Sequence, residues 1–110
     1  MELTKMSTNL LDTMHEARAL ADKLEILIEQ KANTEYDYQI AASKKRITLK
    51  DNNVPVSHIE GIIRGLPEVA ELRLARDLSD ERLKAAYKKL TILSDIMSGV
   101  QSLLKYQSEV

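Results

Sequence analysis

Cysteine, tryptophan and phenylalanine are all absent from this 110-residue chain. Without cysteine the protein has no disulfide, no cysteine-ligated zinc and no thiol nucleophile. Three glycines and two prolines leave few turn residues for an all-β fold. Basic and acidic residues are nearly balanced, 16 against 17, so no strong overall field attracts nucleic acid or anionic lipid.

Long hydrophobic runs are missing as well. The strongest one, residues 24–28, contains Glu25 and is far shorter than the roughly 20 residues that a membrane span needs. The first residues, MELTK, show no apolar core of a signal peptide. With 44% hydrophobic and 30% charged residues, the composition is typical of one globular domain. We therefore expect a cytoplasmic protein with no membrane contact.

The first half of the chain has apolar residues at the spacing of one helical face. No glycine or proline occurs before Pro55, which favours a single helix over about residues 3–50, with a break near Asn33 as the alternative. The predicted face consists of Leu3, Met6, Leu10, Met14, Ala17, Ala21, Leu24 and Ile28, continued by Tyr36, Ile40, Ser43 and Ile47.

A corner follows this helix. Residues 51–55, DNNVP, end it because Asp and Asn tolerate turn geometry and proline disfavours a helical conformation before it. Ser57 and Glu60 fit a capping box, Gly65 suits a left-handed helix end, and Pro67 suits a first helical turn. The sequence predicts a single helical domain with helices over about 3–50, 58–64 and 67–107.

The last helix carries the clearest pattern, a heptad seam with alternating steps of three and four residues. Towards its start, Arg76 and Ser79 interrupt the seam, so we expect the packing face to shift there. Four further residues, Leu74, Leu78, Ile96 and Leu103, widen the stripe and indicate more than one packing partner. The seam itself consists of Leu83, Ala86, Leu90, Leu93, Met97, Val100 and Leu104.

These elements predict an all-α fold: a long, coiled-coil-like antiparallel helical hairpin with a short capped helix at the corner. A two-helix hairpin leaves part of such wide apolar stripes in contact with water. Either the first helix folds back near Asn33 into a bundle, or several chains associate. We favour self-association into a homo-oligomer through the heptad seam.

Patterns that carry chemistry are few. Asp12 and His15 form half of a bundle-type metal site, but no matching motif exists on another helix. The chain has no phosphate-binding glycine loop, no dinucleotide fingerprint and no nucleophile elbow. We therefore predict no catalytic residue, no metal, no cofactor and no enzymatic activity.

One basic cluster stands out, formed by Lys44, Lys45, Arg46 and Lys50. Contacts from these side chains to phosphates would give salt-sensitive binding without sequence preference. The simpler interpretation is a charged, solvated end of the hairpin.

Three segments, 36–38 (YDY), 69–77 (VAELRLARD) and 83–88 (LKAAYK), resemble small α-helical proteins of phages and prophages of Gram-positive bacteria. The resemblance implies a phage or prophage setting in a bacterial cytoplasm, often beside recombination and replication functions. It implies no activity and no functional residues.

Two hypotheses of function follow. The first is a non-catalytic interaction protein, an assembly or regulatory adaptor that self-associates and binds an unidentified protein partner. The alternative is an accessory nucleic-acid-binding factor of a recombination or replication module, which contacts phosphates through the basic cluster.

Overall fold

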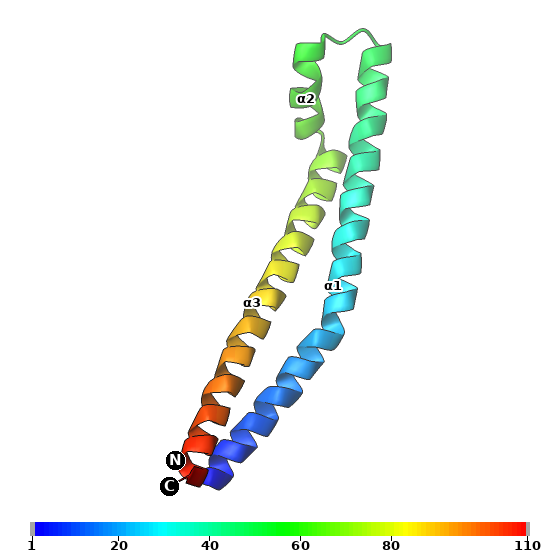
Figure 1. Cartoon of the computed structure of the whole chain (residues 1–110). Coiled ribbons are helices and arrows are strands. Elements are labelled where there is room, and N and C mark those ends of the chain that lie inside the picture. The colour runs from blue at the N-terminus through cyan, green and yellow to red at the C-terminus, as the bar shows by residue number, and fades with distance from the viewer. Residues whose placement is uncertain (1, 110) are drawn as a thin grey trace. The chain divides into compact units, whose positions relative to one another are not determined.

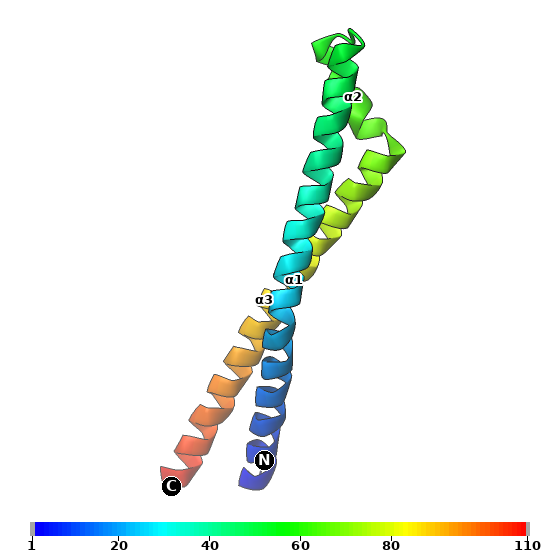
Figure 2. The same cartoon turned by 90° about the vertical axis from the view of Figure 1, so that its right-hand side faces the viewer.

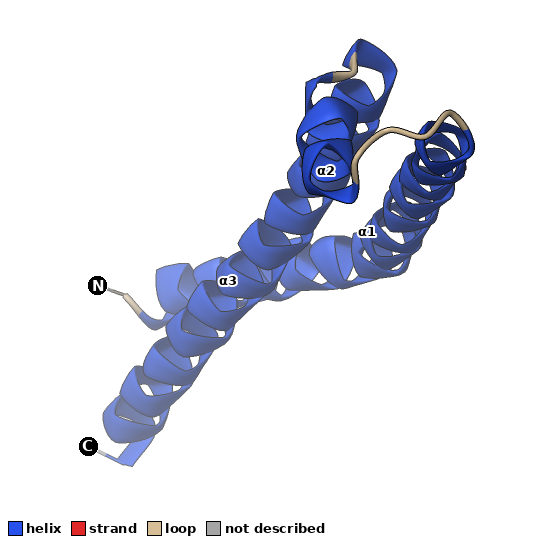
Figure 3. Ribbon diagram, turned by 90° about the horizontal axis from the view of Figure 1, so that it is seen from above, coloured by secondary structure: helices blue, strands red, loops and turns tan. Residues whose placement is uncertain are grey.

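The computed structural model describes residues 2–109, and all regular structure among them is helical (Figures 1 and 3). Helix α1 spans Leu3–Asp51, α2 spans Val56–Gly65 and α3 spans Pro67–Glu109. This confirms the all-α class and the helical hairpin with a short helix at its corner. Helix α1 is continuous at Asn33, so the alternative break does not occur there.

The chain forms two compact units. Unit 1 combines α1 up to Ile26 with α3 from Leu83. Unit 2 spans Leu27–Arg82 and contains the rest of α1, all of α2 and the start of α3. Within each unit the segments of α1 and α3 run antiparallel, because the chain reverses its direction around α2 (Figure 2).

Helix α1 ends in a Schellman motif. The amide of Val54 donates to the carbonyl of Leu49 at 3.0 Å, and the amide of Asn53 donates to that of Lys50 at 3.0 Å. Asn53 takes the left-handed conformation, with φ 59°, that this motif requires. Val54 and Leu49 both pack against the core of unit 2, so the apolar contact that accompanies the motif also fixes the start of the corner.

The predicted capping box at the start of α2 does not form. The helix begins two residues earlier than expected, with Pro55 as its N-cap and no side-chain hydrogen bond at the cap. Glu60 does not reach back to Ser57. Its carboxylate instead binds the guanidinium of Arg46 on α1, and a two-point hydrogen bond to a cation is stronger than one to a neutral amide.

The end of α2 also differs from the prediction. Gly65 is the last helical residue and has no positive φ. Leu66 follows with an extended backbone, φ −72° and ψ 125°, because the ring of Pro67 disfavours a helical residue before it. The carbonyl of Leu66 then accepts a hydrogen bond from the amide of Ala70 at 2.8 Å, so α3 begins directly after the bend.

The apolar core of unit 2 joins all three helices. Val69 at the start of α3 is fully buried, and it lies with Ala42 of α1 and with Ile59 and Ile63 of α2. Four half-buried residues complete this cluster: Tyr38, Leu49, Val54 and Leu66. The core therefore holds α2 against the antiparallel helices and shapes the surface described below.

The apolar face predicted for α1 was wrong in its register. Met6, Leu10, Ala17 and Leu24 are buried or half-buried as expected, but the other large apolar members of the predicted face are exposed. The buried face follows strictly alternating steps of four and three, the 3.5-residue period of a helix that stays in contact with one antiparallel neighbour. In the first half of α1 it consists of Met6, Leu10, Thr13, Ala17, Leu20, Leu24 and Leu27.

Helix α3 keeps one packing face across its polar residues. Val69, Leu72, Arg76, Ser79 and Leu83 recur at steps of three and four, and all five are buried or half-buried. The predicted shift of the packing face at Arg76 and Ser79 was therefore wrong. Polar residues at seam positions are tolerated where they find partners, and Arg76 has them.

The guanidinium of Arg76 lies over the ring of Tyr38, 4.2 Å from its centre. Its Nε donates to Asp77 at 3.1 Å and lies 3.7 Å from a carboxylate oxygen of Glu35 on α1. Partial burial opposes the charge, but the hydrogen bond to Asp77 and the charges of Asp77 and Glu35 raise the pKa of Arg76 above its usual range. The seam of unit 2 thus combines an apolar core with ion pairs.

Candidate interaction surfaces

The predicted self-association seam lies on the face of α3 that packs in unit 1. Leu83, Ala86 and Leu93 are buried and the other four members are half-buried. The facing positions come from the first half of α1, and a salt bridge of 3.2 Å between Lys89 and Glu16 ties the two helices together. A second copy of the chain reaches these side chains only if α1 moves away.

A second apolar stripe lies beside this seam, one residue earlier in each heptad. Four large side chains form it, and between 45% and 67% of each is exposed. The sequence pattern pointed to Ile96 and Leu103 as surplus apolar residues but missed the other two. We call this set the flank stripe: Ile92, Ile96, Leu103 and Tyr106.

Gly99 occupies the centre of the flank stripe. A Cβ built on it meets no atom within 4 Å, so nothing in the described chain requires a glycine at this position. A glycine inside a helix costs about 1 kcal/mol relative to alanine. The residue therefore weakens α3 without any benefit to its intrachain packing, and it leaves the backbone open to close approach from outside.

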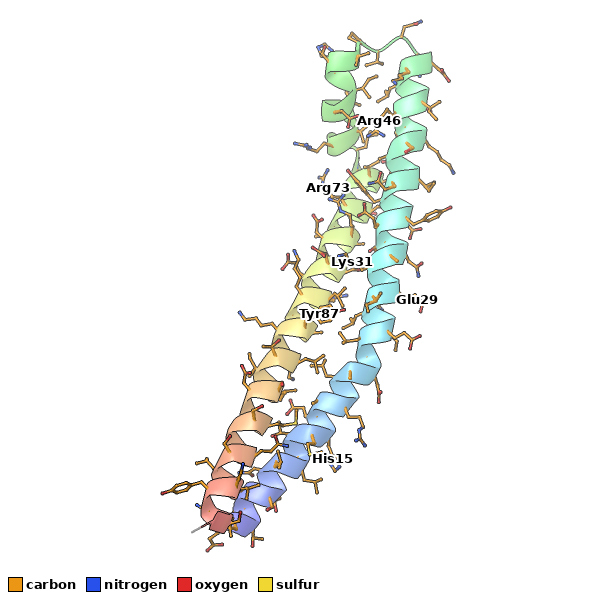
Figure 4. The ribbon with its side chains drawn as sticks, viewed as in Figure 1. His15, Glu29, Lys31, Arg46, Arg73 and Tyr87 are labelled. Atoms are coloured by element: carbon orange, nitrogen blue, oxygen red, sulfur yellow. The ribbon has the colours of Figure 1, made fainter. Side chains whose placement is uncertain are left out.

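The basic cluster lies at the end of α1, in unit 2 (Figure 4). Arg46 donates to Glu60 through Nε at 2.6 Å and through Nη2 at 3.2 Å. Lys45 forms a salt bridge of 3.2 Å with Glu68 of α3. Lys44 and Lys50 make no ion pair with any described residue. Two of the four positive charges are therefore paired with carboxylates.

The two ion pairs also change the protonation of their acidic partners. The hydrogen bond from Arg46, supported by its charge, lowers the pKa of Glu60 below its ordinary value. For Glu68, its own backbone amide and the hydrogen bond from Lys45 lower the pKa in the same direction. Both carboxylates therefore stay charged at neutral pH and reduce the attraction of this cluster for phosphates.

Among the described side chains, those of residues 2–108, no group of three His, Asp or Glu is arranged to hold a metal ion. In that range, no helix has the combined length and apolar character of a membrane crossing. Comparison with protein-family models, curated proteins and solved structures gives no match.

Proposed function

We propose that the chain is a non-catalytic interaction protein that self-associates, with a second copy docked on the flank stripe. It would serve as an assembly or regulatory adaptor, in the phage or prophage setting that the sequence resemblance implies. The observation that carries this proposal is the flank stripe itself: four large apolar side chains, half exposed, aligned along one helix.

The spacing of the flank stripe supports a second copy as the occupant. Its positions, with Gly99 included, follow steps of four, three, four and three, so Ile92 and Tyr106 each lie seven residues from Gly99, whereas Ile96 and Leu103 lie three and four residues from it. Two antiparallel copies related by a twofold axis at Gly99 would place Ile92 opposite Tyr106, and Ile96 within one residue of Leu103. The two glycines would then face each other and allow the helices to approach closely.

Charges on the edge of the stripe fit the same arrangement. Asp95 and Lys105 lie on one side of it, and neither forms an ion pair with a described residue. In an antiparallel pair centred on Gly99, Asp95 of each copy would lie on the same side of the contact as Lys105 of the other, about two residues apart along the helix axis. Burial of each half-exposed apolar side chain would contribute roughly 1 kcal/mol, or about 8 kcal/mol over both copies before the cost of association is subtracted.

The test is the solution mass of the full chain, measured by light scattering on a sizing column at about 100 µM. We expect twice the mass of the 12.5 kDa chain. Ile96→Glu combined with Leu103→Glu should give a monomer that is still helical by circular dichroism. Leu74→Glu is the matched control, since Leu74 is an exposed leucine of α3 outside the stripe, and it should leave the dimer intact.

The charge pair tests the antiparallel register. Asp95→Lys should weaken the dimer several-fold by placing like charges together, and the exchange of both residues, Asp95→Lys with Lys105→Asp, should restore it. A monomeric wild type, or a dimer that survives the double glutamate variant, would refute the proposal.

The ion pairs of Lys45 and Arg46 disfavour the nucleic-acid alternative. Only Lys44 and Lys50 keep unpaired charges in the cluster, whereas nucleic-acid-binding proteins with strong salt dependence contact about six to ten phosphates. No observation favours this alternative over self-association.

A further inference from the structure

A cavity of about 390 Å³ lies in unit 2, where the three helices meet. Helix α1 contributes Tyr38, α2 contributes Glu60, Ile63 and Arg64, and α3 contributes Arg73 and Arg76. Its size is that of a site for a small molecule. Figure 4 shows Arg73 on α3 and Arg46 on α1 in this same region.

Two of the charged side chains in the cavity wall already have ionic partners. Arg76 is paired with Asp77 and Glu35, at 3.1 and 3.7 Å, and stacks on Tyr38. The carboxylate of Glu60 is held by Arg46 at 2.6 Å. Neither Arg76 nor Glu60 therefore decides by itself whether the cavity favours an anion or a cation.

Arg64 and Arg73 differ from these residues. Neither guanidinium forms an ion pair with any described residue. The only hydrogen bond that joins them runs from Nη1 of Arg73 to the backbone carbonyl of Arg64, at 3.4 Å. This contact links the α3 arginine to the end of α2 and leaves the other guanidinium donors available. These two positive charges lie on two different helices and form no ion pair of their own, although the carboxylate of Glu60, which Arg46 holds, lies in the same wall and is attracted to Arg64.

We propose that this cavity binds the phosphate dianion of a small phosphate monoester. Guanidinium groups match phosphate oxygens with paired N–H donors, and two guanidinium groups without an ion pair of their own match the two negative charges of the dianion. Ile63 and the edge of Tyr38 provide an apolar wall for the organic part of the ester. The site is independent of the flank stripe, which belongs to unit 1.

The experiment is a titration of the ¹⁵N-labelled full chain with inorganic phosphate and with phenyl phosphate at about pH 7.5 and low salt. We expect saturable shifts of the amides in residues 60–64 and 73–76, with phenyl phosphate binding more tightly than inorganic phosphate. Arg64→Gln and Arg73→Gln should each weaken binding about tenfold. Arg82→Gln removes an exposed arginine of the same unit outside the cavity, and it should leave binding unchanged.

Two further measurements distinguish binding at this site from a general attraction of anions. Because the second pKa of a phosphate ester is about 6, binding should weaken at pH 5, whereas sulfate, which stays a dianion, should bind equally at both pH values. Glu60→Gln removes the carboxylate from the wall and should strengthen binding.

Three results would overturn the proposal: no saturable shifts with either phosphate, an equal loss of binding in Arg82→Gln, or binding of a short single-stranded oligonucleotide that phenyl phosphate does not displace. The monomeric variant Ile96→Glu with Leu103→Glu should bind phenyl phosphate as the wild type does. A failure of self-association therefore leaves this test intact, and the reverse also holds.

Discussion

Leu93 and Ile92 are neighbours on α3 with opposite environments, and their replacement by alanine separates the intrachain seam from the flank stripe. Only 5% of Leu93 is exposed, against 50% of Ile92. Leu93→Ala removes buried methyl groups and leaves a cavity between the helices of unit 1. The expected loss in free energy of unfolding is about 2–3 kcal/mol, in the lower part of the range for such substitutions because a two-helix seam can partly close around the gap.

Ile92→Ala should change the free energy of unfolding of the monomer by about 0.5 kcal/mol or less, because the side chain is half exposed and alanine is the better helix former. The assay is urea unfolding followed by circular dichroism at about 1 µM and again at about 20 µM, so that any contribution of the dimer to stability shows as a dependence on concentration. The solution mass at high concentration is measured alongside. Ile92→Ala should lower the dimer fraction and Leu93→Ala should not.

The reverse pattern would refute this reasoning. If Leu93→Ala dissociated the oligomer and left the monomer stable, the heptad seam would be the interface between chains, as the sequence pattern first suggested. Equal stability losses in both variants would show that α3 is rotated relative to the structure described above.

Two other predictions concern the corner. Gly65→Ala should stabilise the chain by about 0.5–1 kcal/mol in the same urea assay, since Gly65 has no positive φ and an added Cβ meets no atom within 4 Å. Asn53→Ala should destabilise the chain by about 1 kcal/mol, because Asn53 has a φ of 59°. A destabilised Gly65→Ala would point to a left-handed glycine after all. The Arg46 hydrogen bond lowers the pKa of Glu60 from 4.5, so its stabilising effect is present above about pH 4.5 and is lost as the pH falls through the lowered value. Melting temperatures across this range should therefore depend less on pH in Glu60→Gln, and identical pH profiles would contradict the role of this ion pair.

The candidate surfaces could be predicted only in part. The heptad pattern correctly grouped the seven seam residues on one face of α3, and surplus leucines and isoleucines signalled that a second face exists. Which of the two faces packs against α1 was not visible, because both have the same apolar character and nearly the same spacing. The cavity of unit 2 could not be predicted from the sequence either. Its arginines lie on α2 and α3, and only the bend at Leu66 brings them to one wall with Tyr38 of α1.

Local chemistry in the sequence determined the all-α class, the long first helix and the place of the corner. Helix-forming residues without glycine or proline before Pro55 favour one continuous helix, and the two prolines restrict the backbone on either side of α2 whatever the rest of the chain does. The contacts between helices decided the rest. Continuous contact with a neighbouring helix imposed the 3.5-residue period on the buried face of α1. Glu60 binds the guanidinium of Arg46 and therefore does not cap α2. Because Pro67 keeps Leu66 extended, α2 ends without a left-handed Gly65. These outcomes depend on which groups meet in space, and the spacing of residues along one helix does not carry that information.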